Sequence, residues 1–175
     1  MNTQKLEKQT NEAIDYWINE YKRYDWDKIQ MKPAENSWSL GQIGIHLWMS
    51  SKNFFFKNAE KCLNKEGVEK GKKKKFGAHV IFTFHTLPPV RYEMPAQVSV
   101  QPREPESKEQ LIAKLEDIKA QAAAYIKRIA DSDPELKIKH PFLGWLNTAE
   151  WITLCNIHFR HHMRQKKRLE QHFGW

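Results

Sequence analysis

Apolar residues recur at helical spacing in four stretches of the chain. These stretches cover about residues 3 to 30, 39 to 62, 107 to 131 and 147 to 171. In each of them the apolar positions follow i, i+3, i+4 and i+7, which places them along one side of a helix. The pattern therefore predicts four amphipathic helices whose apolar faces pack together.

Three of the four stretches begin with a helix-start signal. A side chain that can accept a hydrogen bond at the first position is followed three residues later by Gln or Glu, and the pair can satisfy two free backbone amides of the first turn. The three pairs are Ser39 with Gln42, Ser107 with Gln110, and Asn147 with Glu150.

The connection between the second and third stretches is about forty residues long, which is far more than two antiparallel helices need. It contains HVIFTFH at residues 79 to 85, which is β-branched and aromatic, followed by a segment with five prolines. We expect a short strand pair within this crossover. The predicted fold is an all-α four-helix bundle with one long crossover between helices two and three, as a single domain over residues 1–175.

Three histidines fall on the inward faces of these helices. At 100° per residue, His158 and His162 lie within about 40° of each other on the apolar stripe of helix four. His46 is bracketed by apolar positions on helix two. His161 lies at the edge of the stripe, about 60° to the other side.

Three buried imidazoles are difficult to satisfy with hydrogen bonds alone, and a divalent metal ion would resolve this. Residues at i and i+4 are neighbours on a helix, so His158 and His162 can converge on one ion while His46 approaches from another helix. Three neutral ligands leave coordination positions open, as in reactive sites, since structural zinc sites usually have four protein ligands. The set His46, His158 and His162 is the predicted metal site.

Simpler interpretations stay open beside this one. A His-x-x-x-His pair arises often by chance, and His46 taken alone fits a core histidine that is bonded to a backbone carbonyl. Cys155, one turn before His158, fits either a small buried residue or a thiolate ligand.

Composition narrows the classes of protein that fit. The chain has 175 residues, of which 40% are hydrophobic and 29% charged, so it can bury a core without disulfides. Its two cysteines indicate free thiols and a reducing compartment, and no apolar run suits a signal peptide or a membrane span. We expect a soluble cytoplasmic protein with no membrane partner.

The net charge of +8 raises the alternative of a nucleic-acid-binding module. Much of the excess lies in residues 69 to 76, which contain a lysine run at 72 to 75, and in residues 164 to 170. Neither segment is interleaved with aromatic residues that could stack on bases. A lysine run beside glycines is typical of a solvated loop. Nucleic acid is therefore the weaker prediction.

SWSLGQIGIHLWMSS at residues 37 to 51 and HPFLGWLNTAEWITLCNIHFRHHMRQ at residues 140 to 165 resemble the DinB-like superfamily of bacterial metal-binding four-helix bundles. The family pattern has Trp-Ser at the start of helix two, a His two turns later, and His-x-x-x-His followed by a basic residue and Gln. These positions correspond to Trp38, Ser39, His46, His158, His162, Arg164 and Gln165. Met163 and Arg164 depart slightly from the usual His-Arg-Gly-Gln.

The resemblance implies that zinc, nickel or iron is bound by three histidines, often in a homodimer. Characterised relatives include transferases and isomerases that use low-molecular-weight thiols such as mycothiol or bacillithiol. The working hypothesis is a metal-dependent enzyme of the thiol-dependent transferase type, with hydrolysis as a variant and a small molecule, in first place a thiol, as substrate. Arg160 and Arg164 are expected to meet an anionic group on that substrate, with Gln165 as a further candidate contact. The alternative is a non-catalytic metal-binding or stress-response protein.

Overall fold

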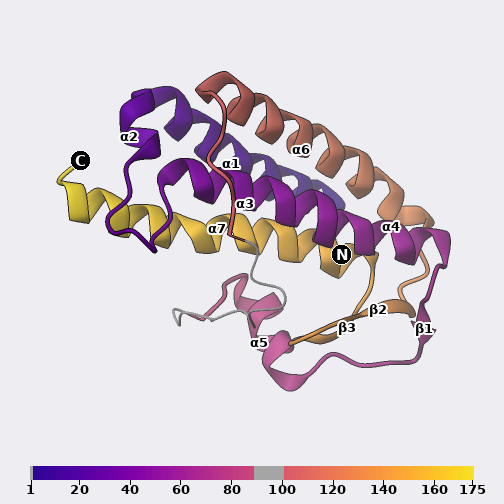
Figure 1. Ribbon diagram of the computed structural model, residues 1–175. Coiled ribbons are helices and arrows are strands. Elements are labelled where there is room, and N and C mark those ends of the chain that lie inside the picture. The colour runs from indigo at the N-terminus through magenta and orange to yellow at the C-terminus, as the bar shows by residue number, and fades with distance from the viewer. Residues whose placement is uncertain (1, 89–100) are drawn as a thin grey trace.

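Four long helical rods form a bundle, with a small sheet and a short helix beside one end (Figure 1). The computed structural model describes residues 2–88 and 101–175. The rods are α1 (Thr3–Arg23), the continuous run α3 (Leu40–Ser50), η1 (Ser51–Phe56) and α4 (Lys57–Asn64), α6 (Lys108–Arg128) with the short 3-10 turn η2 (Ile129–Asp131), and α7 (Thr148–Phe173). The predicted four-helix bundle with a long crossover is confirmed. None of the described helices is long and apolar enough to cross a membrane.

The first predicted helix is broken near its end. Instead of continuing to residue 30, α1 stops at Arg23, and a second helix, α2 (Trp26–Gln30), follows an extended Tyr24 and Asp25. The Tyr24 hydroxyl bonds Glu170 on α7, and the side chain is buried. A tertiary contact, which helical periodicity does not encode, therefore sets the end of α1.

The predicted helix starts are confirmed, two of them as complete capping boxes. The Ser39 hydroxyl accepts from the Gln42 amide at 3.0 Å, and Gln42 Oε1 accepts from the Ser39 amide at 3.1 Å. Asn147 and Glu150 form the same reciprocal pair. At the third start the Ser107 hydroxyl accepts from the Gln110 amide, but the Gln110 side chain accepts from the Glu106 amide instead of Ser107.

The crossover carries a helix where a strand was expected. Residues 79 to 85 fall almost entirely in α5 (Phe76–Phe84), so the strand prediction was wrong. A short apolar run has no decisive period, and here Ala78 and Ile81, at helical spacing, are the two positions that pack inward. The rest of the expected strand pair involves residues 89–100, which lie outside the described part of the chain.

The strands of the described residues lie elsewhere. The sheet has the order β1 (Glu69–Lys70), β2 (Leu136–His140) and β3 (Gly144–Leu146), with both pairings antiparallel. The β2–β3 hairpin occupies the connection between α6 and α7, and only β1 comes from the crossover. Ile138 pairs with Leu146 and Lys137 with Glu69.

The lysine run is part of this layer, and not simply a solvated loop. Lys74 forms an isolated bridge with Gly144, is half-buried, and makes an ion pair with Glu150 at the start of α7. Lys72, Lys73 and Lys75 are exposed, as expected. The prediction was therefore right for three of the four lysines and wrong for Lys74.

Close approach between α1 and α3 sets the position of the second rod. The Tyr21 hydroxyl donates to the Leu40 carbonyl at 2.9 Å, and the tyrosine is fully buried. A Cβ at Gly44 would lie 2.6 Å from that hydroxyl oxygen and 2.8 Å from Leu111 Cδ1. Glycine at this position therefore lets α3 sit against α1 and α6 at the depth that carries His46 inward.

His140 predicts a pH dependence of stability. Its Nδ1 accepts from the amides of Phe142 at 3.1 Å and Leu143 at 3.2 Å, and burial, with the Lys75 charge second, lowers its pKa to about 4. In the unfolded chain His140 binds a proton near pH 6.5, whereas in the native chain it binds one only near pH 4. The contribution of His140 to stability is therefore complete above pH 6.5 and is lost as pH falls toward 4.

In urea unfolding of chelator-treated protein, His140→Asn is expected to reduce the loss of stability between pH 7 and pH 5. Asparagine can still accept from the amide two residues later and does not titrate. An unchanged pH slope in this variant would contradict the assignment.

Candidate metal centre

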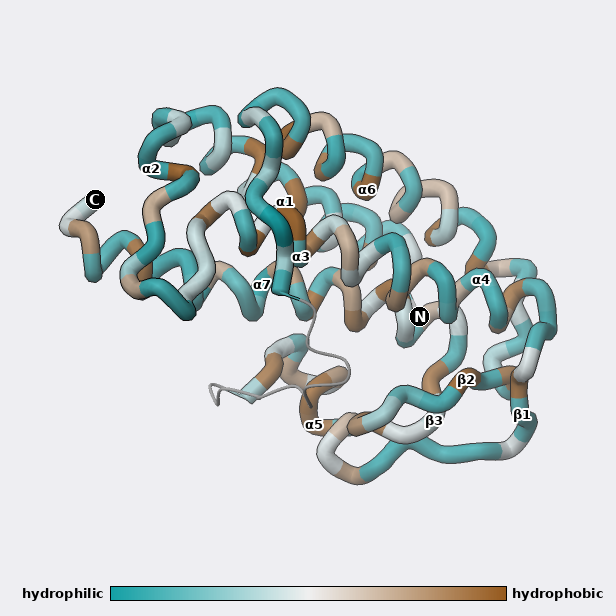
Figure 2. Tube along the Cα trace, viewed as in Figure 1, coloured by the Kyte–Doolittle hydropathy of each residue, from teal (hydrophilic) through white to brown (hydrophobic). Residues whose placement is uncertain are grey.

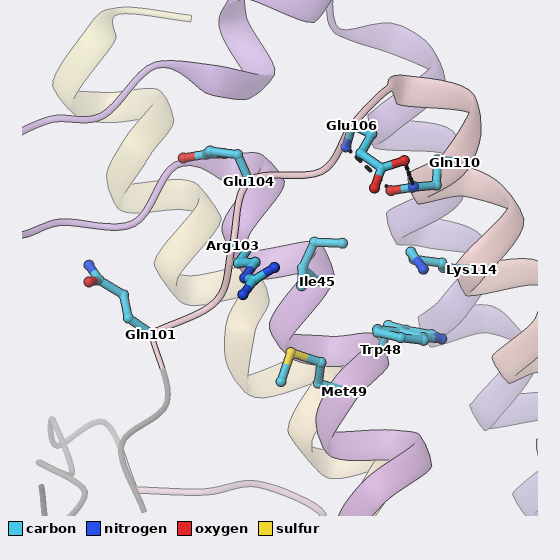
Figure 3. A pocket seen from close by; sticks show the side chains of 9 residues that line it. All are labelled: Ile45, Trp48, Met49, Gln101, Arg103, Glu104, Glu106, Gln110 and Lys114. Atoms are coloured by element: carbon cyan, nitrogen blue, oxygen red, sulfur yellow. Dashed lines mark hydrogen bonds between the residues drawn. The ribbon is translucent and has the colours of Figure 1, made fainter.

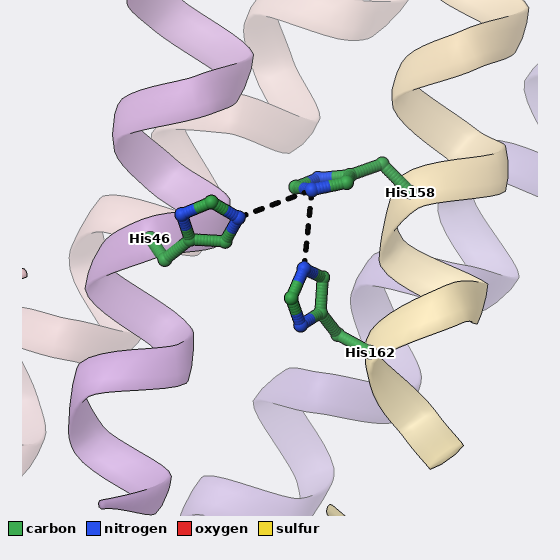
Figure 4. A group of neighbouring side chains, drawn as sticks. All are labelled: His46, His158 and His162. Carbon is green, nitrogen blue, oxygen red and sulfur yellow. Dashed lines mark hydrogen bonds between the residues drawn. The ribbon is translucent and has the colours of Figure 1, made fainter. Parts of the chain in front are cut away.

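Three histidines from two rods meet in the middle of the bundle (Figure 4). His46 comes from α3, and His158 and His162 come from successive turns of α7. His158 Nε2 lies 3.1 Å from His46 Nε2 and 3.1 Å from His162 Nε2, and the ligand atoms all lie within 4.8 Å of one another. The structure thus brings together the three side chains that the sequence singled out.

Local sequence explains why these side chains converge. The Ser39 capping box fixes the first turn of α3, and His46 follows two turns later on the side of α3 that faces α7. On α7, the i, i+4 spacing places His158 and His162 one above the other.

Hydrogen bonds within the protein do not satisfy this cluster. His162 Nδ1 lies 2.8 Å from Gln165 Oε1, and because an amide oxygen only accepts, the proton sits on Nδ1 and Nε2 presents a lone pair. His158 Nδ1 is buried without a hydrogen-bond partner. One proton on His158 Nε2 would have to serve two facing nitrogens, whereas a cation at the meeting point would satisfy all three.

Two of the three nitrogen separations also fit a metal. Two nitrogens that each bind an ion at about 2.0–2.1 Å with tetrahedral angles lie about 3.3 Å apart. The two observed separations of 3.1 Å are within a few tenths of an ångström of that value. Neutral imidazoles suit zinc, nickel and iron alike.

Burial keeps these histidines neutral. Burial, with the His161 charge second, lowers the pKa of His46 to about 4. Burial also lowers the pKa values of His158 and His162 well below the usual range. Their lone pairs are therefore available to a metal at neutral pH without first losing a proton.

The family model of the DinB superfamily matches residues 10–165, which is most of the chain. The protein belongs to the DinB superfamily. A search of curated proteins gave no significant match. Among solved structures, this superfamily member is similar to one described as TT2238, a four-helix bundle protein. The TM-score is 0.58 at 14% identity, with 95% of this chain and 99% of that chain covered. At that identity the likeness supports the fold alone.

Aromatic rings enclose the histidines of this DinB-superfamily protein. Trp38 packs against His46 with ring centroids 4.9 Å apart, and Phe55 packs edge-on against His158 at 5.2 Å. His162 is 8% exposed, whereas His46 and His158 are half-buried, so the centre is reached from their side. Phe55 was missed from sequence because its position depends on the π-helical segment η1.

The cluster contains no carboxylate among the described residues. Glu150, two turns before His158 in the sequence, accepts from the Asn147 amide and pairs with Lys74. It belongs to the helix start and not to the centre. The candidate donor set is therefore three neutral nitrogens.

The three expected substrate contacts occupy different places. Gln165 is the one beside a histidine, through its contact with His162 Nδ1. Arg164 donates to the Leu87 carbonyl and the Thr86 hydroxyl, each at 2.8 Å, and so fastens the end of α5 to α7. Arg160 is exposed and lies about 200° around α7 from His158.

His161 and Cys155, the two other candidates near the histidines, do not belong to the cluster. His161 packs edge-on against His162 at 5.4 Å between ring centroids but stays outside the cluster. Cys155 is a free, buried thiol 3.3 Å from the Ser51 hydroxyl, and burial raises its pKa to about 12. It is a small buried residue and not a thiolate.

A separate surface pocket of about 270 Å³ lies on the other side of α3 (Figure 3). Trp48 and Met49 line it from the second rod, Lys114 from α6 and Arg103 from the end of the crossover. Lys114 Nζ lies 3.9 Å above the Trp48 ring. None of the three histidines lines this pocket, so it is distinct from the candidate centre.

Proposed function

We propose that this DinB-superfamily protein binds one divalent metal ion, zinc, nickel or iron, through His46, His158 and His162, and acts as a metal-dependent, thiol-using transferase. The observation that carries the proposal is the convergence of three Nε2 atoms, which a single proton on His158 Nε2 cannot satisfy together. A bound ion would supply Lewis-acid chemistry, lowering the pKa of a thiol or water molecule that binds it.

The chain's own residues prepare the site for such a reaction. Gln165 holds the proton of His162 on Nδ1 and so keeps Nε2 directed at the centre. Trp38 and Phe55 cover two of the imidazoles and reduce the water around them. Three protein ligands leave positions for a substrate.

The neutral donor set favours a thiol over water as the reacting group. Hydrolysis usually needs a positioned base, and the described residues place no carboxylate at the cluster. A thiol has a much lower pKa than water and needs less help to ionise, since free thiols already titrate near pH 8.5. The two arginines that the sequence suggested as substrate contacts do not support this step, because Arg160 lies on another side of α7 and Arg164 is bonded to Thr86 and Leu87.

We propose in addition a homodimer in the cytoplasm. The support is the family resemblance for the dimer and the two free, buried thiols, which suit a reducing compartment.

Cobalt substitution tests the proposed chemistry. The protein is purified without a metal-affinity column, stripped with a chelator and loaded with Co²⁺. Titration with a small thiol is then expected to produce sulfur-to-cobalt charge-transfer absorbance, because a thiolate can occupy an open position.

The control is the same titration of His158→Ala, which is expected to give no such band. A wild-type protein that binds one equivalent of cobalt but shows an unchanged spectrum at saturating thiol would retain metal binding and overturn the thiol proposal. Failure to bind cobalt at all would overturn both.

A further inference from the structure

The exposed large hydrophobic side chains of the described residues are concentrated at one place. Four of the five lie on α5 or on the hairpin turn beside it, and two are far more exposed than is usual for phenylalanine: Phe76 at 85% and Phe84 at 70%. The other two are Val80 and Phe142, each 46% exposed, and the fifth, Met31, lies elsewhere. Scattered single exposures are normal, whereas a contiguous apolar patch marks an interaction site.

These side chains form one surface. Phe76, Val80 and Phe84 are spaced at i, i+4 and i+8, so they share a side of α5 opposite the buried Ala78 and Ile81. The Lys75 amide donates to the Leu143 carbonyl at 2.9 Å, which brings the hairpin turn with Phe142 to the start of α5. Figure 2 shows α5 as a strongly hydrophobic element set apart from the bundle. We call the four residues Phe76, Val80, Phe84 and Phe142 the α5 face.

The chain around the α5 face is strongly basic. Residues 70–88 and 136–146 contain seven lysines and no aspartate or glutamate, although Glu69 lies 3.2 Å from Lys72 Nζ and Glu150 pairs with Lys74. Lys72, Lys73 and Lys75 are exposed directly before α5, and Lys139 is exposed on β2. The partner of this surface must therefore combine an apolar interior with negative charge at its boundary.

The helix α5, which carries most of the α5 face, is held to the rest of the protein at both ends. The chain just before α5 is fixed by the bridge between Lys74 and Gly144, and the chain just after it by the two hydrogen bonds from Arg164 to Thr86 and Leu87. The phenylalanines therefore project from a fixed helix, and binding a partner does not carry the entropic cost of ordering a free segment.

We propose that the α5 face binds the surface of an anionic lipid bilayer, with its apolar side chains in the interfacial region and Lys72, Lys73 and Lys75 against lipid headgroups. Apolar and basic residues on adjoining parts of a short amphipathic element are typical of peripheral membrane binding. A second copy of this chain fits less well, because a twofold contact would bring the same lysines together. This proposal replaces the expectation from sequence that the protein has no membrane partner.

Vesicle sedimentation tests the proposal on the full-length protein. Binding to vesicles of phosphatidylcholine with about 30% phosphatidylserine is expected, with weak binding to phosphatidylcholine alone and weakening as salt screens the lysines. Phe76→Ser/Phe84→Ser is expected to abolish binding. Lys72→Gln/Lys73→Gln/Lys75→Gln is expected to weaken it by about fivefold for each lysine removed.

Two matched controls separate this site from general charge and apolarity. Lys5→Gln/Lys8→Gln/Lys127→Gln removes the same charge from exposed positions on α1 and α6. Met31→Ser removes the fifth of the large exposed hydrophobic side chains among the described residues. Both are expected to bind vesicles as the wild type does. Because all substituted residues are exposed, the thermal unfolding midpoint should stay unchanged.

Several results would overturn the proposal. One is equal vesicle binding by the wild type and the double serine variant, and another is absence of binding by the wild type. A third is a concentration-dependent dimer, seen by analytical ultracentrifugation without lipid and abolished by the serine pair, which would assign the α5 face to a second copy. Finally, an equal loss of vesicle binding in the Lys5→Gln/Lys8→Gln/Lys127→Gln control would show that binding depends on net charge and not on the α5 face.

Discussion

Alanine at His46, His158 or His162 is expected to lower affinity for a divalent ion by more than the roughly 10–100-fold that loss of a supporting side chain costs. Each of these histidines contributes one of only three nitrogens to the centre, and no fourth protein ligand joins them among the described residues. Removing any one of them leaves only two donor nitrogens to hold the ion. Metal content by elemental analysis and Kd values from competition with a chromogenic chelator would measure the effect.

The chain offers two graded controls for this result. Gln165→Ala removes the acceptor that holds the His162 proton on Nδ1, so a loss of about 10–100-fold is expected while stoichiometric binding persists at high metal. His161→Ala removes an adjacent ring that lies outside the cluster, so a small change is expected. Full retention by His162→Ala together with equal loss in His161→Ala would contradict the register of α7.

Replacing Lys166 by Met is expected to destabilise the protein by about 3 kcal/mol. The Lys166 side chain is 3% exposed, and its Nζ lies 2.7 Å from both Glu20 Oε2 and Glu170 Oε1. Burial lowers the pKa of Lys166, but hydrogen bonds to Glu170 and Glu20 outweigh that effect, so the amine stays charged. The substitution leaves two carboxylates facing each other between α1 and α7, with the more exposed Arg23 beside both and the Tyr24 hydroxyl still bonded to Glu170.

A second ion pair provides the comparison. Lys119 and Asp15 link α1 to α6 at 2.7 Å, but their side chains are 36% and 43% exposed. Lys119→Met is therefore expected to cost less than about 1 kcal/mol. Urea unfolding of both variants in the presence of a chelator would measure the difference, and equal losses would show that burial of Lys166 does not govern its contribution.

The bundle could be predicted from sequence because its determinants are local. Apolar spacing and the pairs Ser39 with Gln42 and Asn147 with Glu150 indicate where helices run and begin, and these features need no knowledge of the partner helix. The three histidines could be predicted for the same reason, because the sequence of each helix alone shows which of its residues lie on the apolar side.

The remaining features depend on contacts between distant segments. The end of α1 at Arg23 follows from the contact of Tyr24 with Glu170, and the β2–β3 hairpin is completed by Lys74 bridging to Gly144. Residues 79 to 85 were assigned the wrong type because both periods place some apolar residues on a common face. The helix is favoured over the strand because Ala78 and Ile81, which share one side of a helix, are both buried in the folded protein.

Arg164 shows the same limit for function. Its position after the His-x-x-x-His pair suggested a substrate contact, whereas its hydrogen bonds go to Thr86 and Leu87 of the crossover. A charge beside a site in sequence is thus not necessarily directed into it.

The π-helical segment η1, Ser51–Phe56, also has a consequence for changes in chain length. A π-turn contains about one residue more than an α-turn, because each hydrogen bond spans five residues instead of four. Deleting one residue within η1 would convert it to an α-helix and keep the inward faces of α3 and α4 aligned, whereas a deletion within α3 or α4 would rotate everything beyond it by about 100°. Along the second rod, η1 is therefore the place where this DinB-superfamily chain can lose a residue and still present His46 and the buried Cys62 to the same core.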